Sequence, residues 1–264
     1  MEALLVATVA LLLGLAALGA ITLHKVRRIH QMQFSIQLDL TAIRQEVETQ
    51  YRQLEALAAL NRLLRLEIPL PALRGWAGSP DFLLILAEHV LTAHPERILE
   101  CSSGASTLTL ARCLELVGSG HVFSLEHDPV YARRTRAALV RRSLDRWATV
   151  VDAPLTALDG SGSQPWYSTA ALPDDAGPFD MLVIDGPPQS TAPLARRPAL
   201  PVLWPRLVPD CVTFLDDADR PDEKTAVAGW LEQYPDLEAS RLEAEKGCAR
   251  ISRRSGGAPT GREP

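Results

Sequence analysis

The chain has 264 residues, of which 47% are hydrophobic and 22% are charged, and its formal net charge is -5 at pH 7. This length allows one or two domains with a sizeable core, and the lack of a basic excess argues against a nucleic-acid partner. The four cysteines lie at no metal-ligand spacing and are too few for a disulfide scaffold. We therefore expect reduced, buried thiols.

Residues 3–23 carry no charged side chain and consist mainly of Leu, Ala and Val. About 20 such residues cross the hydrocarbon core of a bilayer, which predicts a transmembrane anchor. Lys25, Arg27 and Arg28 follow directly, and because basic residues favour the cytoplasmic side we expect the N-terminus outside and the rest of the chain in the cytoplasm. The alternative is a cleaved signal peptide with "ALGA" at 17–20 as its cleavage site, but no basic region precedes the apolar stretch.

The next segment has the pattern of an amphipathic helix, because its apolar residues recur at spacings of three and four. These residues are Ile36, Leu40, Ile43, Val47, Leu54, Leu57, Leu60 and Leu64. The stripe predicts a stalk that either pairs two chains as a coiled coil, forming a homodimer, or folds back on the domain. Three prolines and two glycines in "EIPLPALRGWAGSP", residues 67–80, then break the helix.

We therefore divide the chain into an anchor (1–24), a helical stalk (25–67), a globular domain (68–252) and a disordered tail (253–264). Strand-like and helix-like segments alternate in the domain, which predicts a Rossmann-like, doubly wound α/β fold with a mainly parallel seven-stranded sheet. The expected strands are 97–101, 121–127, 148–151, 179–185, 211–215, 237–243 and 248–252. The expected helices are 81–93, 107–117, 129–143, 194–207 and 223–234.

Ligands of such sheets lie beyond the carboxyl ends of the strands, so acids at those ends should gather along one rim. They are Glu100, Glu126, Asp128, Asp185, Asp216 and Asp217. The loop "CSSGAS" after Glu100 lacks the Gly-x-Gly-x-x-Gly of dinucleotide sites, and the chain has no Gly-Lys-Ser or Gly-Lys-Thr of a P-loop. A cationic nucleoside without phosphates fits better, because Glu100 can attract an ammonium group and Glu126 can accept hydrogen bonds from two ribose hydroxyls.

Four motifs resemble those of the class I S-adenosylmethionine-dependent methyltransferases, over roughly residues 68–252. They are "LECSSGAST", similar to the family's Leu-Glu-x-Gly-x-Gly-x-Ser-Thr, then "VFSLEHDP", "FDMLVIDGPP" and "FLDDADRPDE". The resemblance implies S-adenosylmethionine as the cofactor, bound by Glu100, Ser102, Gly104, Ser106, Glu126 and Asp152. Of these, Glu100 and Gly104 would hold the methionine end, Glu126 the ribose, and Asp152 would approach the adenine. Ser102 stands where the family has its first glycine, and its side chain would crowd the methionine moiety.

A likeness to catechol-type O-methyltransferases implies a metal as well. In that type an acid after strand four and an acidic pair, or Asp-Asn, after strand five bind Mg²⁺. The matching residues are Asp185, Asp216 and Asp217, with Asp185 and Asp216 as catalytic residues, because the ion holds a substrate hydroxyl and favours its deprotonation. Gly-Pro-Pro follows Asp185 where that type has a lysine, so no general base is evident. In the alternative, Asp185 positions cofactor or substrate, and Asp217 or Asp219 caps the next helix.

Other residues near these motifs have two interpretations each. Arg196 and Arg197 either bind an anionic acceptor or form a solvated helix face. Trp166 and Tyr167, in a long loop before the strand 179–185, either cover the acceptor or anchor the loop in the core. Asp128, followed by proline, is expected to cap a helix.

Together these features predict a membrane-anchored methyltransferase that acts on oxygen in a small-molecule or lipid-linked acceptor. The alternative is a non-catalytic, membrane-anchored scaffold that retains a nucleoside-binding fold. The missing glycine fingerprint disfavours a nicotinamide oxidoreductase.

Overall fold

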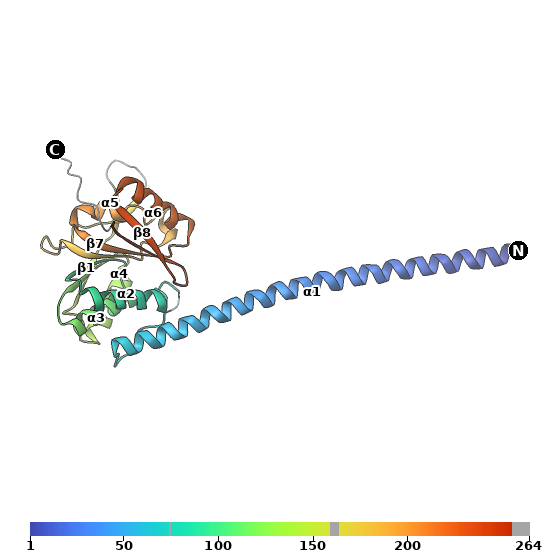
Figure 1. The fold of residues 1–264 in the computed structure, drawn as a ribbon, viewed down its shortest axis with the longest axis horizontal. Helices are drawn as coiled ribbons and strands as arrows, with labels where there is room; N and C mark the ends of the chain where they lie inside the picture. The colour runs from blue at the N-terminus through green and yellow to red at the C-terminus, as the bar shows by residue number, and fades with distance from the viewer. Residues whose placement is uncertain (74, 159–163, 255–264) are drawn as a thin grey trace. The chain divides into compact units, whose positions relative to one another are not determined.

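The computed structural model describes residues 1–73, 75–158 and 164–254. The chain forms two compact units, Met1–Tyr51 and Arg52–Pro264, which are described separately (Figure 1). The predicted disordered tail, from residue 255 onward, lies outside the described residues, and Arg253 still belongs to the last strand.

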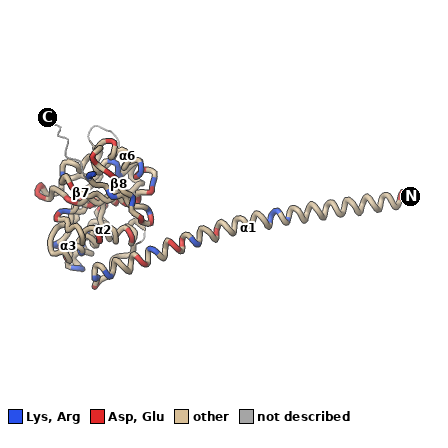
Figure 2. The backbone as a smooth tube through the Cα atoms, viewed as in Figure 1, with Lys and Arg blue, Asp and Glu red and all other residues tan. Residues whose placement is uncertain are grey.

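The first unit is the larger part of helix α1, Glu2–Leu64. Near the N-terminus the helix is almost free of charge up to a group of basic residues (Figure 2). The hydroxyls of Thr8 and Thr22 donate to the carbonyls of Leu4 and Leu18, each over 2.8 Å, as polar groups in apolar surroundings must. With a mean hydropathy of 2.6 in its most apolar window, α1 is long and apolar enough to cross a membrane, a test that a signal sequence also passes.

The last turns of α1 belong to the second unit. There Ala56, Leu60 and Leu64 are buried, in contrast to the exposed apolar residues of the first unit. The helix ends at Leu64, and its terminal carbonyl accepts a hydrogen bond from Nε of Arg112 over 2.8 Å. This end of the predicted stalk is therefore part of the globular core.

A seven-stranded sheet forms the centre of the second unit, in the order β3-β2-β1-β6-β7-β9-β8. The strands are β1 (Arg97–Cys101), β2 (His121–Glu126), β3 (Ala148–Asp152), β6 (Phe179–Ile184), β7 (Leu207–Asp216), β8 (Leu237–Leu242) and β9 (Cys248–Arg253). Strand β9 is antiparallel to both of its neighbours, and the other adjacent pairs are parallel. The predicted mainly parallel sheet of seven strands is confirmed.

Helices cover both faces of this sheet, which explains the nearly continuous apolar strands. The helices are α2 (Pro80–Ala93), α3 (Ala105–Val117), α4 (Pro129–Val140), α5 (Ala199–Leu203) and α6 (Pro221–Gln233), with short 3-10 turns η1 (Gln189–Thr191) and η2 (Trp204–Arg206). Successive residues of a strand enter different cores, as Ile98 and Leu99 of β1 show. The predicted helix over 194–207 is wrong in extent, because its prolines interrupt the hydrogen-bond ladder and leave only α5 and η2.

A small antiparallel pair of strands stands apart from the main sheet. It consists of β4 (Leu155–Ala157) and β5 (Pro165–Tyr167), in a segment predicted as loop. Trp166 and Tyr167 lie in β5 and are buried, with 0% and 2% of their surface exposed. Of their two predicted roles, the structure supports the core anchor. Strands of three residues are too short to show a period-2 pattern.

Candidate cofactor site and acidic cluster

The buried carboxylate of Glu100 organises the loop that follows β1. Its Oε2 accepts a hydrogen bond from Oγ1 of Thr107 over 2.6 Å and another from Oγ of Ser124. The same Thr107 oxygen accepts from the backbone N–H of Gly104 over 3.0 Å, which ties the loop glycine to the acid. Burial raises the pKa of Glu100 to about 7, although the neighbouring hydroxyls act in the opposite direction.

Ser102 and Gly104 give this loop an unusual backbone. Their φ angles are +116° and +153°, which only glycine adopts without strain. Ser102 thus stands at the family's glycine position in a conformation that favours glycine, while its N–H donates to the carbonyl of Leu125 over 2.9 Å. Ser106, which is also among the predicted cofactor contacts, is buried in the first turn of α3.

Glu126, the last residue of β2, meets the same loop. Its Oε2 accepts a hydrogen bond from Oγ of Ser103 over 2.8 Å, and its Oε1 accepts from the N–H of Asp128 over 3.0 Å. Glu100 and Glu126 therefore converge on one loop, as the methyltransferase interpretation requires. Asp128 accepts hydrogen bonds from the first N–H groups of α4, so its predicted cap is confirmed.

Asp152 ends β3, directly beside Glu126 in the sheet register. Its side chain is 65% exposed and pairs with Nη2 of Arg136 over 2.9 Å. Asp152 thus lies at the same rim as Glu126, with an exposed side chain.

Three further acids gather at the ends of β6 and β7. Asp185, Asp216 and Asp217 each offer a carboxylate oxygen, and these oxygens lie within 4.8 Å of one another. Burial and the charge of Asp216 raise the pKa of Asp185 well above its ordinary value. Burial and the charge of Asp217 raise the pKa of Asp216 to about 6. The negative charges are therefore crowded, and a proton or a cation between them would relieve the repulsion.

Arg196 is the internal counter-charge of this cluster and is only 5% exposed. Its Nη2 lies 2.9 Å from Oδ2 of Asp217 and donates to the carbonyl of Asp185 over 2.9 Å, while its Nη1 donates to the carbonyl of Asp216 over 2.9 Å. The solvated helix face predicted for Arg196 is wrong, because its side chain is buried. Its two terminal nitrogens already bind protein oxygens, while its Nε has no hydrogen-bond partner among the described residues. Arg197 is exposed, and no pattern in the sequence distinguishes these two neighbours.

The acids suit a hard divalent cation by ligand type. Within the described part of the chain, Oδ1 of Asp216 and Oδ1 of Asp217 are buried without a hydrogen-bond partner, as oxygens reserved for an ion would be. Protein cations offset part of the charge: Nη1 of Arg220 lies 2.8 Å and Nζ of Lys246 lies 3.8 Å from Asp217. The carboxylates are thus the ligand type that Mg²⁺ prefers, but Arg196, Arg220 and Lys246 already offset their charge.

Tyr167, one of the two residues expected to cover the acceptor or to anchor the loop, lies between the Ser102 loop and the segment after β6. A Cβ atom at Gly186 would lie 2.3 Å from its hydroxyl and 3.1 Å from Cβ of Ser102, so only glycine fits there. Burial raises the pKa of Tyr167 well above 10, which keeps the hydroxyl protonated as a donor. The hydroxyl has no hydrogen-bond partner among the described residues.

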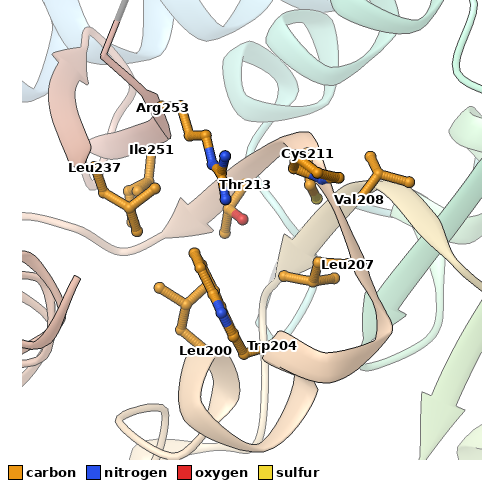
Figure 3. Close-up of a pocket in the computed structure, with 10 residues that line it drawn as sticks. Leu200, Trp204, Leu207, Val208, Cys211, Thr213, Leu237, Ile251 and Arg253 are labelled. Atoms are coloured by element: carbon orange, nitrogen blue, oxygen red, sulfur yellow. The ribbon is translucent and has the colours of Figure 1, made fainter. Parts of the chain in front are cut away.

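A separate cavity of about 80 Å³ lies near the start of β7, away from these acids (Figure 3). Leu200 and Trp204 face Leu237, Ile251 and Arg253 across it. Its volume is far below the roughly 300–1,000 Å³ typical of ligand pockets. The carboxylates at the opposite ends of the strands remain the better candidate site.

The sheet order, with an acid-bearing loop at the point where the strand order reverses, defines a Rossmann-like fold. Residues 99–218 match a family model described as a methyltransferase domain. This match confirms the predicted resemblance to the class I S-adenosylmethionine-dependent methyltransferases.

Solved structures with this fold include the Podospora anserina methyltransferase PaMTH1 with bound SAH, at 15% identity and a TM-score of 0.55, covering 76% of this chain and 88% of that one. Cofactor-bound Rv0187 from MTB is 22% identical with a TM-score of 0.52, covering 78% and 91%. At these identities the likeness concerns the fold. No curated protein matches the chain.

Proposed function

We propose that the protein is a membrane-anchored methyltransferase that transfers the methyl group of S-adenosylmethionine to an oxygen of a small-molecule or lipid-linked acceptor. The observation that carries this proposal is the convergence of Glu100 and Glu126 on one loop, through Thr107 and Ser103. The bound SAH of PaMTH1, a protein with the same fold, supports the choice of cofactor.

The position of each residue indicates which part of the cofactor or acceptor it would contact. Glu126 would accept the ribose hydroxyls, the loop at Ser102 and Gly104 would approach the methionine end, and Asp152 would lie towards the adenine. In the reaction the bond between sulfur and the methyl carbon breaks, a bond from the acceptor oxygen to that carbon forms, and the hydroxyl proton leaves. Without a bound cation, burial raises the pKa of Asp216 to about 6, which suits its carboxylate to receive that proton.

Mg²⁺ is a second part of this proposal, held by Asp185, Asp216 and Asp217. When bound, the ion would lower the pKa of the acceptor hydroxyl. Addition of EDTA to an active preparation should abolish turnover, and Mn²⁺ used as a spectroscopic probe should bind to the protein but not to an Asp217→Asn variant. Unchanged activity in EDTA, together with unaltered Mn²⁺ spectra, would overturn the metal part of the proposal and leave Arg196, Arg220 and Lys246 as the counter-charges of the cluster.

The cofactor assignment is tested by calorimetric titration of the full chain in detergent with S-adenosylhomocysteine. We expect binding by the unaltered protein and by Glu238→Ala, which removes an exposed acid of β8, and loss of binding in Glu126→Ala. Binding that survives Glu126→Ala would contradict the assigned ribose contact. The absence of any binding would favour the scaffold alternative. Ser102 is the residue that favours this alternative, because it has a side chain where the backbone conformation suits glycine.

A further inference from the structure

Helix α1 carries an exposed apolar seam between its uncharged stretch and the globular unit. Val26, Gln33, Leu40 and Val47 alternate with Ile29, Ile36, Ile43 and Gln50 at spacings of three and four. They occupy the a and d positions of an unbroken heptad repeat. The six apolar members are between 50% and 63% exposed.

This seam requires a partner, because a regular apolar stripe in water stabilises nothing by itself. Lipid is a poor candidate, since Arg28, Asp39, Arg44 and Glu48 are interspersed with the seam and would have to enter the bilayer. A spacing of 3.5 residues instead suits a second helix with the same repeat, around which α1 would supercoil.

We propose that residues 26–50 pair with the same segment of a second copy, as a parallel coiled coil in register. Charges beside the seam support this orientation. Asp39 occupies a g position and Arg44 the e position five residues later, which face each other across a parallel pair and would form two symmetric ion pairs. An antiparallel pair would lose this g-to-e match.

Two polar layers specify the register. Gln33 lies at an a position and Gln50 at a d position, where a polar side chain is tolerated when it meets its own copy. A shift by one heptad would bring each glutamine against an apolar residue and leave its amide without a partner. The seam thus selects one alignment, although glutamine in the core lowers its strength.

Disulfide cross-linking in membranes that contain the full chain tests the seam. The four natural cysteines are all buried, so an introduced cysteine should react alone. Ile43→Cys places a thiol in the seam, and Gln45→Cys, two residues away at an f position, places a matched thiol on the opposite side. We expect a band of twice the chain's mass for Ile43→Cys and little for Gln45→Cys. Equal yields, or none for Ile43→Cys, would overturn the proposal.

Charge reversal tests the parallel orientation. In sedimentation equilibrium of the detergent-solubilised chain, Asp39→Arg should raise the dissociation constant about fivefold, since two exposed pairs at about 0.5 kcal/mol each are lost. Arg44→Asp should do the same, and the double variant should recover the original affinity. A double variant as weak as either single one would refute the g-to-e pairing. Binding of S-adenosylhomocysteine should not change in these variants, which separates the pairing from the proposed function.

Discussion

At the scale of single residues, Ser102 is under backbone strain because its φ of +116° favours glycine. We expect Ser102→Gly to raise the free energy of unfolding by about 1 kcal/mol, since the relieved strain exceeds the added entropy of the unfolded chain. Urea unfolding followed by tryptophan fluorescence would measure it.

The control is Ser119→Gly, at an exposed loop position that is not among the residues with positive φ. At this position glycine only increases the conformational entropy of the unfolded chain, so Ser119→Gly should lower the free energy of unfolding slightly. If both variants were destabilised alike, Ser102 would not be strained.

Glu100 should make stability depend on pH. Its pKa is about 7 in the folded protein, against an ordinary value of 4.5, so the folded state binds the proton more tightly. Stability should therefore fall as pH rises from about 4.5 to about 7, by about 3 kcal/mol for this group, and change no further above that range. Glu100→Gln cannot ionise and should flatten the profile, with a residual slope of the same sign from Asp185 and Asp216. If the free energy of unfolding of Glu100→Gln depended on pH as steeply as that of the unaltered protein, other groups would cause the pH dependence.

At the scale of elements, Arg196 joins the ends of β6 and β7 through the carbonyls of Asp185 and Asp216. Arg196→Gln would remove these hydrogen bonds and leave the carboxylate of Asp217 without its closest buried partner. We expect a loss of about 3–5 kcal/mol in the free energy of unfolding, measured in urea.

Arg197→Gln is the matched control for this loss, because Arg197 adjoins Arg196 and is exposed. Its effect should stay within about 0.5 kcal/mol. Similar values for the two variants would show that the guanidinium of Arg196 is not what joins the strands.

At the scale of the whole molecule, the proposed anchor predicts how the chain behaves in cells. In a bacterial expression host, the full chain should stay in the membrane pellet after alkaline carbonate treatment. Protease added outside spheroplasts should spare the domain, because Lys25, Arg27 and Arg28 favour a cytoplasmic position.

Leu12→Arg combined with Leu13→Arg should shift the chain to the soluble fraction, since each charge at mid-membrane costs about 2.5–3.5 kcal/mol. Release of the unaltered chain by carbonate would indicate a cleaved signal peptide. Digestion of the domain by protease added outside would contradict the predicted cytoplasmic orientation.

The sequence alone determined the order of the seven main-sheet strands along the chain and the acids at their ends. These features follow from local hydrophobic periodicity, and parallel strands necessarily bring their carboxyl ends to one edge. Helix ends marked by strong local signals, such as Asp128 before proline, were also predictable.

Only the tertiary structure decided which of two adjacent arginines is buried among the acids, and that Thr107 and Ser124 hold Glu100. It also decided that Tyr167 lies against Gly186. Each contact joins residues far apart in the chain or depends on which side of a turn faces the core. Such contacts form only when the helices and strands pack together, so the hydrophobic periodicity of a single segment does not predict them.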